Sequence, residues 1–197
     1  PSVFSALLDS DEAGLFSIAP DWAHPRQQQL YLPDTNILQT RWLGPEGVAE
    51  MTDYMPICRQ HDSLPRLIRR VKMLRGEARF TFHCSPRHDY ARAETTASAG
   101  PGYIDFSASG QPTLRLAATV NMTQELHAAT GSFHLKAGED VVFICGSSDD
   151  PHGTALNTLH CFDETLHYWR HWSRPSTYRG RSQETGPRPA LVLKLLT

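Results

Sequence analysis

The sequence has no excess of charge and no long apolar run, and each absence excludes a class of partner. Its 197 residues include 19 basic and 21 acidic side chains, which give a net charge of -2. A protein that holds a nucleic-acid backbone needs a basic patch, so no nucleic-acid partner is expected. A helix that spans a bilayer needs roughly 20 apolar residues, and no such run occurs, so no membrane partner is expected.

The short motifs of common catalytic and nucleotide-binding sites are missing as well. Gly-x-Ser-x-Gly, the P-loop, His-Glu-x-x-His and Gly-x-Gly-x-x-Gly do not occur. The four cysteines, Cys58, Cys84, Cys145 and Cys161, form no Cys-x-x-Cys pair and are expected to be reduced. Cys84 and Cys145 stand in apolar strand patterns, which predicts buried thiols and a cytoplasmic setting. No metal and no cofactor is predicted.

Both ends of the sequence indicate a fragment. The chain starts at Pro1 without an initiator Met or a charged leader. It ends in the apolar run Ala190 to Leu196, which has the pattern of a helix start without a partner. An apolar helix face that stays in water is unfavourable, so we expect this segment to belong to a further domain.

Short alternating segments predict an antiparallel β-sandwich of about ten strands between Leu15 and Ser147. The residues 36–55 predict a hairpin around the turn cluster 44–47. Two alternating runs, 67–74 and 77–84, predict a second hairpin around Arg75 and Gly76. Further strands are predicted at 103–107, 113–118, 123–128, 132–135 and 141–145.

The pattern changes from strand to helix after Pro151. Phe162, Leu166, Trp169 and Trp172 fit one helical stripe, and Pro175 ends it. A polar, breaker-rich stretch from residue 176 to residue 189 precedes the terminal apolar run. The order predicts a sandwich over 1–150, a helical linker over 151–180 and the start of another domain over 181–197.

Two clusters of reactive side chains have a chemical interpretation and a structural one. Glu164, His167 and His171 share a face of the predicted helix, where they could ligate a metal or form the polar side of the helix. Cys84 stands close in sequence to His88 and could be a nucleophile, but its place in the strand alternation points inward. A buried thiol is inert, so we favour the structural interpretation of both clusters.

Eight segments resemble, in order, the N-terminal region of bacterial and archaeal family 15 glycoside hydrolases, which include glucoamylase-like and trehalase-like enzymes. They are residues 1–9, 31–40, 52–56, 67–71, 86–92, 168–172, 178–180 and 190–197. The resemblance implies a supersandwich-like β-domain, a linker helix and then an (α/α)6 barrel that carries two catalytic Glu residues. The catalytic segments of the family would follow Thr197, so no catalytic residue is assigned here. The double-carboxylate pattern of a glycosidase is likewise absent from the sequence.

The resulting hypothesis is a non-catalytic domain that packs on the catalytic barrel of an α-glucoside hydrolase in the same polypeptide. Contact with carbohydrate substrate would come through that parent enzyme. The side chains expected to dock on the barrel are Trp169, Trp172, Tyr178, Leu191, Leu193 and Leu195. Without the barrel, the same surface predicts a homodimer. The alternative is a stand-alone carbohydrate-binding module, for which the candidate platform residues are Trp22, Trp42, Tyr54 and Tyr103.

Overall fold

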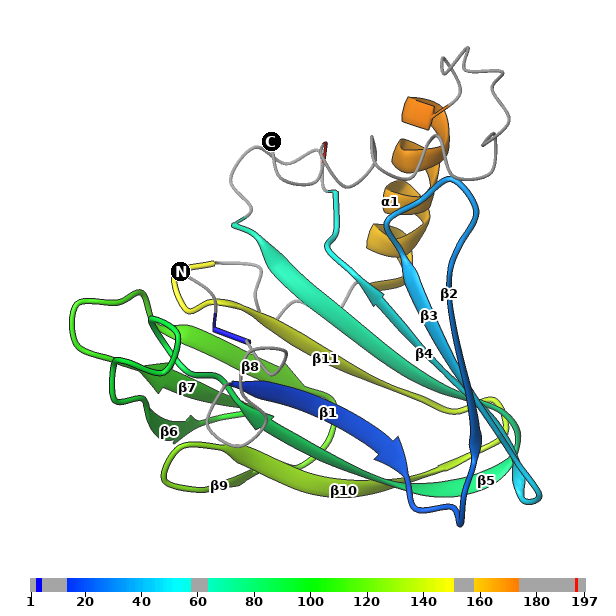
Figure 1. The fold of residues 1–197 in the computed structure, drawn as a ribbon, viewed down its shortest axis with the longest axis horizontal. Helices are drawn as coiled ribbons and strands as arrows, with labels where there is room; N and C mark the ends of the chain where they lie inside the picture. The colour runs from blue at the N-terminus through cyan, green and yellow to red at the C-terminus, as the bar shows by residue number, and fades with distance from the viewer. Residues whose placement is uncertain (1–2, 5–13, 58–63, 151–157, 174–193, 195–197) are drawn as a thin grey trace.

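The computed structural model describes residues 3–4, 14–57, 64–150, 158–173 and 194. These residues form two antiparallel β-layers and one helix, which confirms the expected mainly β sandwich (Figure 1). The elements are β1 (Leu15–Pro20), β2 (Arg26–Tyr31), β3 (Leu38–Gly44), β4 (Gly47–Tyr54), β5 (Arg66–Ser85), β6 (Thr96–Gly100), β7 (Tyr103–Ser107), β8 (Leu114–Ala118), β9 (Thr123–Gln124), β10 (Ala129–Lys136), β11 (Asp140–Ser147) and α1 (Thr158–Ser173). No helix among them is long and apolar enough to cross a membrane.

The strand β5 belongs to both layers of the sandwich. Its first half pairs with β4 and β11 in the layer ordered β2-β3-β4-β5-β11-β8-β7-β6. Its second half pairs with β1 and β10 in the other layer, where β10 also pairs with β9. Figure 1 shows β5 bending at the lower right, where the two layers meet.

The predicted hairpin around Gly76 is therefore wrong. The two runs do not pair with each other, because each finds its partners in a different layer. Gly76 has φ 75°, and a Cβ there would lie 1.9 Å from the carbonyl oxygen of Glu46. The glycine that suggested a turn thus permits a bend inside one long strand.

Adjacent residues of β11 face two different hydrophobic clusters. Phe143 and Cys145 point into the main core between the layers, which also contains Phe80, Phe106 and Leu116. Val142 and Ile144 point to the outer face and join the second cluster, formed with Ile37, Tyr54 and Ile68. The strand is buried on both faces because a helix covers that outer side.

The side chain of Gln124 joins the two layers at β6. Its amide oxygen accepts a hydrogen bond from the Ala99 backbone nitrogen at 2.9 Å, and its amide nitrogen donates to the Ala97 carbonyl at 2.8 Å. The Ala97 nitrogen donates to the Leu126 carbonyl at 3.1 Å. These bonds occupy the backbone groups that an edge strand would otherwise leave open to pairing.

Candidate functional site: the helical end of the sandwich

The helix α1 packs on the outer face of the first layer through its apolar stripe. Phe162 and Leu166 pack against the second cluster, and the ring of Phe162 meets the ring of Tyr54 edge-on at 5.5 Å. This is the stripe that the sequence predicted. The helix therefore packs on the sandwich through contacts within this chain.

A buried hydroxyl joins α1 to the segment that follows β4. Thr165 has no exposed surface, and its hydroxyl accepts a hydrogen bond from the Ile57 backbone nitrogen at 3.0 Å. The same hydroxyl donates to the carbonyl of Cys161, one turn earlier, at 2.6 Å. Because the donor on residue 57 is partly buried, the helix must stay in this place to satisfy it.

A buried ion pair holds the end of β11, from which the chain leads to α1. The Arg66 Nη1 atom lies 3.0 Å from Asp150 Oδ2, and the two side chains are 7% and 0% exposed. Gly146 makes room for the pair, because a Cβ there would lie 2.9 Å from the Cβ of Arg66. The pair therefore fixes the backbone position at which the sandwich ends.

Exposed apolar side chains gather around this helix. We define the helical end as the end of the first layer where β2, β4 and β11 finish and β3 and β5 begin, together with α1. It carries five of the nine large apolar side chains that are exposed in the described residues. They are Leu30, Tyr31, Met55, Leu64 and Trp172. Such grouping is typical of an interaction surface rather than of random exposure.

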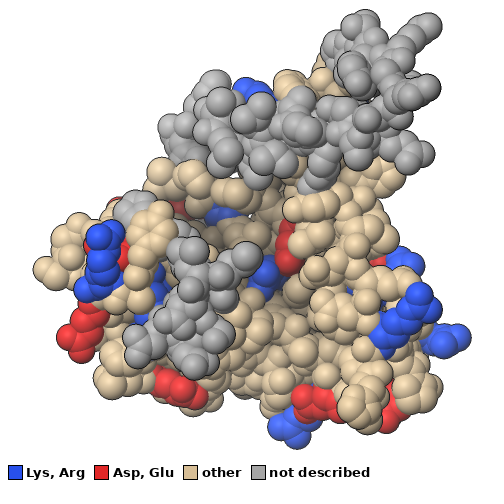
Figure 2. Space-filling view, viewed as in Figure 1, with Lys and Arg blue, Asp and Glu red and all other residues tan. Residues whose placement is uncertain are grey.

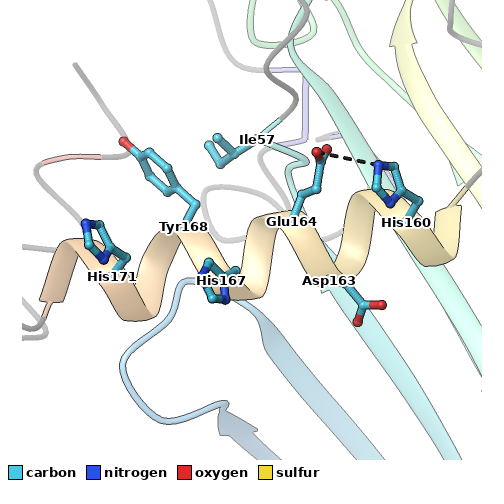
Figure 3. A pocket seen from close by; sticks show the side chains of 7 residues that line it. All are labelled: Ile57, His160, Asp163, Glu164, His167, Tyr168 and His171. Atoms are coloured by element: carbon cyan, nitrogen blue, oxygen red, sulfur yellow. Dashed lines mark ion pairs between the residues drawn. The ribbon is translucent and has the colours of Figure 1, made fainter.

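A cavity of about 500 Å³ lies along α1 and is shown in Figure 3. Its described lining consists of Ile57, His160, Asp163, Glu164, His167, Tyr168 and His171. Glu164 is directed toward His160, with 3.5 Å between the carboxylate and the ring nitrogen (Figure 3). No group of three or more potential metal ligands is found in the part of the chain that the structure describes. Glu164, His167 and His171 line this cavity along α1.

The two predicted docking tryptophans have different surroundings. Trp169 is only 2% exposed, and its ring meets Tyr168 and Trp172 at 5.3 and 6.3 Å. Trp172 is 36% exposed and is the one of the two that offers surface to a partner. The other predicted docking residues, Tyr178, Leu191, Leu193 and Leu195, lie outside the described residues.

The cysteine that the sequence offered as a nucleophile, Cys84, is buried in the core. Cys84 and Cys145 are free thiols with 0% and 4% exposure. Burial raises the pKa of the Cys84 thiol well above its ordinary value and raises the pKa of Cys145 to about 12. A thiol that stays protonated is a poor nucleophile, so neither residue is a catalytic candidate. Cys58 lies outside the described residues.

An ion pair between the layers uses Arg69 and Asp53. Arg69 Nε lies 3.3 Å from Asp53 Oδ1, and the guanidinium also donates to the Phe16 carbonyl and stands 4.5 Å over the Phe16 ring. Burial raises the pKa of Asp53 more than Arg69 lowers it. Arg69 thus connects Asp53 on β4 with Phe16 on β1 and ties the two layers together.

The four aromatic residues suggested as a sugar platform are not available for stacking. Trp22, Trp42 and Tyr54 are 7%, 3% and 3% exposed and belong to the two hydrophobic clusters. Tyr103 has the guanidinium of Arg115 at 3.7 Å over its ring, while Gly100 lies close to the ring from β6. Asp105 holds that guanidinium through two hydrogen bonds of 2.7 Å and raises the pKa of Arg115.

Sequence reasoning missed the groups that seat the helix. Arg66 and Asp150 are 84 positions apart, and Thr165 and residue 57 are 108 apart. A charged residue at the start of an apolar strand and a Thr inside an apolar helix stripe were the available signals. Neither signal names a partner, because the pairing depends on which strands are neighbours.

The chain is an antiparallel sandwich with a helix packed on its outer face. The exposed side chains of Leu30, Tyr31, Met55, Leu64 and Trp172 form an apolar rim around this helix. A family model described as "Trehalase-like, N-terminal" matches residues 1–169, and the chain belongs to that family. The family resemblance drawn from the sequence motifs is confirmed.

Three curated relatives, all named trehalase, match the chain along its whole length. The enzymes of Thermoplasma acidophilum and Mycobacterium tuberculosis are each 27% identical, and that of Mycolicibacterium smegmatis is 28% identical. Each match covers 100% of this chain and 34%, 32% and 33% of the respective relative. The chain thus spans about a third of the length of these relatives and corresponds to a trehalase-like N-terminal domain.

Proposed function

We propose that this chain is the non-catalytic N-terminal domain of a trehalase-type α-glucoside hydrolase. In this proposal its helical end packs on an (α/α)6 catalytic domain of the same polypeptide. The sandwich would occupy residues 1–150, the linker 151–180 and the first barrel helix 181–197. The observation that carries the proposal is the exposed apolar rim around α1, in a domain whose relatives are about three times longer.

The chemistry of the described residues supports the non-catalytic assignment. Glycosidases need two carboxyl groups across the scissile bond, about 5–9.5 Å apart depending on mechanism. Asp53, Asp105 and Asp150 are each engaged by an arginine. The acids along α1, Asp163 and Glu164, line an open cavity without a facing carboxylate from another element in its described lining.

The contacts that fix α1 support a role as a rigid docking surface. A domain that stabilises its neighbour must present a rigid surface, since each side chain ordered on docking costs about 0.5–1.5 kcal/mol. The Thr165 hydroxyl fixes α1, and the Arg66–Asp150 pair fixes the backbone just after β11, before any partner arrives. Docking then orders few additional groups.

The experiment that tests this function compares two proteins for turnover of trehalose. One is the 197-residue chain, and the other is the longer polypeptide encoded by the same reading frame. We expect the longer polypeptide to hydrolyse trehalose and the 197-residue chain to have no activity. Turnover by the short chain that a single substitution within it abolishes would contradict the proposal. A homodimer of the short chain, formed through the helical end, remains a prediction for light scattering.

A further inference from the structure

The strand β2 is an open edge of the first layer. Among the residues that the structure describes, β2 has β3 as its one strand partner, in an uninterrupted register from Arg26 to Tyr31. All six residues of β2 are exposed, so neither face of the strand is covered. An edge strand presents a row of backbone N–H and C=O groups along its outer side, and this row is a template for another strand.

The other strands at the margins of the described sheet are blocked. The Gln124 side chain binds the backbone of β6. The strand β9 has two residues, which is too short for extended pairing. In β1, Pro20 has no N–H to donate, and the Phe16 carbonyl accepts a hydrogen bond from Arg69. Within the described fold, β2 is therefore the edge strand that leaves room for a partner.

The composition of β2 permits pairing instead of preventing it. Edge strands are commonly protected by Lys, Pro, a β-bulge or an inward-pointing charge. The sequence of β2 is Arg-Gln-Gln-Gln-Leu-Tyr, with one charge at its first residue and no bulge against β3. Three consecutive neutral glutamines occupy its centre, and their amides can hydrogen-bond to one another across paired strands.

We propose that β2 pairs antiparallel with β2 of a second copy of this chain, so that the two first layers form one continuous sheet. Residues opposite each other in such a pair lie on the same face, and the two-fold axis therefore passes beside a single residue. With Gln28 on the axis, Arg26 lies opposite Leu30 and Gln27 lies opposite Gln29. The aliphatic stem of Arg26 then covers Leu30, which is 45% exposed. No like charges face each other in this register.

The strand is complementary to itself, which is why a second copy fits it. The contact between Arg26 and Leu30 forms twice about the axis, and the two positive charges lie at opposite ends of the paired segment. The pairing uses residues 26–30 and does not rest on the docking proposed for α1. An interface of one strand per partner is small, so we expect a weak dimer with a Kd of about 0.1 mM.

The first measurement is sedimentation velocity of the 197-residue chain over a concentration range that brackets this Kd. The expected result is a reversible change from monomer to dimer. NMR amide exchange over the same range should show alternate β2 amides protected in the monomer, where they bond to β3, and consecutive amides protected in the dimer. A chain that stays monomeric, or a dimer without added protection at residues 26–30, would overturn the proposal.

Substitutions on the axis test the register. Gln28→Lys and Gln28→Glu each place like charges opposite each other, so each is expected to weaken the dimer about tenfold or more. An equimolar mixture of the two variants is expected to form a heterodimer, because opposite charges then face each other across the axis. Recovery in the mixture also shows that both variants are folded. A mixture that associates no more strongly than either variant alone would refute the pairing.

Two controls separate this edge from other surfaces. Asn121→Lys adds the same charge at an exposed residue outside β2 and should leave dimerisation unchanged. Trp172→Ser removes the exposed tryptophan of α1 and should leave it unchanged as well. An equal loss from Asn121→Lys would show that charge alone, at any position, prevents association. If Trp172→Ser abolishes the dimer and Gln28→Lys does not, the copies associate through α1. Either result contradicts pairing at β2.

Discussion

The two ends of the first β-layer present opposite kinds of surface. At the helical end, Leu30, Tyr31, Met55, Leu64 and Trp172 are exposed around a seated helix. The opposite end, which we call the hairpin end, carries the exposed charged residues Glu46, Arg75, Glu77, Lys136 and Glu139. Charged side chains appear in blue and red at the lower right of Figure 2, over this end. Among the residues that the structure describes, Leu74 is the one large exposed apolar side chain at this end.

The two ends of the sandwich thus differ in the side chains that they expose: apolar at the helical end and charged at the hairpin end. The main core between the layers is well buried, because both layers share β5 and close around Phe80, Phe143 and their neighbours. The cluster under α1 is smaller and ends in exposed apolar surface. Burial of an apolar side chain yields about 1.5–3 kcal/mol, so the helical end has the larger drive to find a partner.

The largest expected loss of stability comes from a substitution in the main core, compared with one at the surface. Phe143 is fully buried and its ring contacts Phe16, Phe82 and Phe133 at 5.9, 4.9 and 5.9 Å. Phe143→Ala should lower the free energy of unfolding by about 3–5 kcal/mol, because it leaves a cavity where the layers meet. Urea unfolding measures this change. Leu126→Ala, at a residue that is 73% exposed, is the control and should change stability by no more than about 0.5 kcal/mol.

The next effect tests whether the end of β11 is fixed by charge. Arg66→Met should cost about 3 kcal/mol, because Asp150 would keep a buried carboxylate without its cation. The exposed pair of Arg92 and Asp89 supplies the comparison, and Arg92→Met should cost no more than about 1 kcal/mol. Equal costs for the two substitutions would show that the buried pair does not anchor the chain.

A smaller effect concerns the helix alone. Thr165→Val keeps the shape of the side chain but removes the acceptor for the Ile57 nitrogen, which should cost about 2 kcal/mol. The loss should appear first as faster exchange of the α1 amides, while the β-layers remain protected. Thr81→Val, at an exposed hydroxyl on β5, should leave both stability and α1 exchange unchanged. Uniform loss of protection across the sandwich would contradict a separately seated helix.

The smallest expected effect on stability comes from substitutions of exposed apolar side chains. These substitutions should nevertheless differ most in their effect on docking. Trp172→Ser and Leu74→Ser each remove one exposed apolar side chain, one from each end of the layer. Both should change the free energy of unfolding of the short chain by no more than about 0.5 kcal/mol. In the longer polypeptide, only Trp172→Ser should lower the midpoint of thermal inactivation of trehalose hydrolysis. A matching loss from Leu74→Ser would remove the distinction between the ends.

The sequence predicts the local elements well and their long-range partners poorly. The alternation in β5 and the stripe Phe162, Leu166 and Trp169 depend on neighbouring residues, and both are observed. The error at Gly76 arose because a bend and a hairpin turn use the same residue type, and only strand pairing distinguishes them. The three successive positive φ angles at Asp89, Tyr90 and Ala91 gave little signal in the sequence, because only Asp89 is of a type that favours this conformation.

The most direct test of the docking account is hydrogen–deuterium exchange on the 197-residue chain and on the longer polypeptide. The account predicts slower exchange in the longer polypeptide at residues 26–31, 55–57 and 160–173, which make up the exposed part of the helical end. Exchange at residues 44–47, 74–77 and 136–139, at the hairpin end, should be the same in both proteins. Protection at the hairpin end, or no protection at the helical end, would contradict the claim that α1 and its apolar rim form the docking surface.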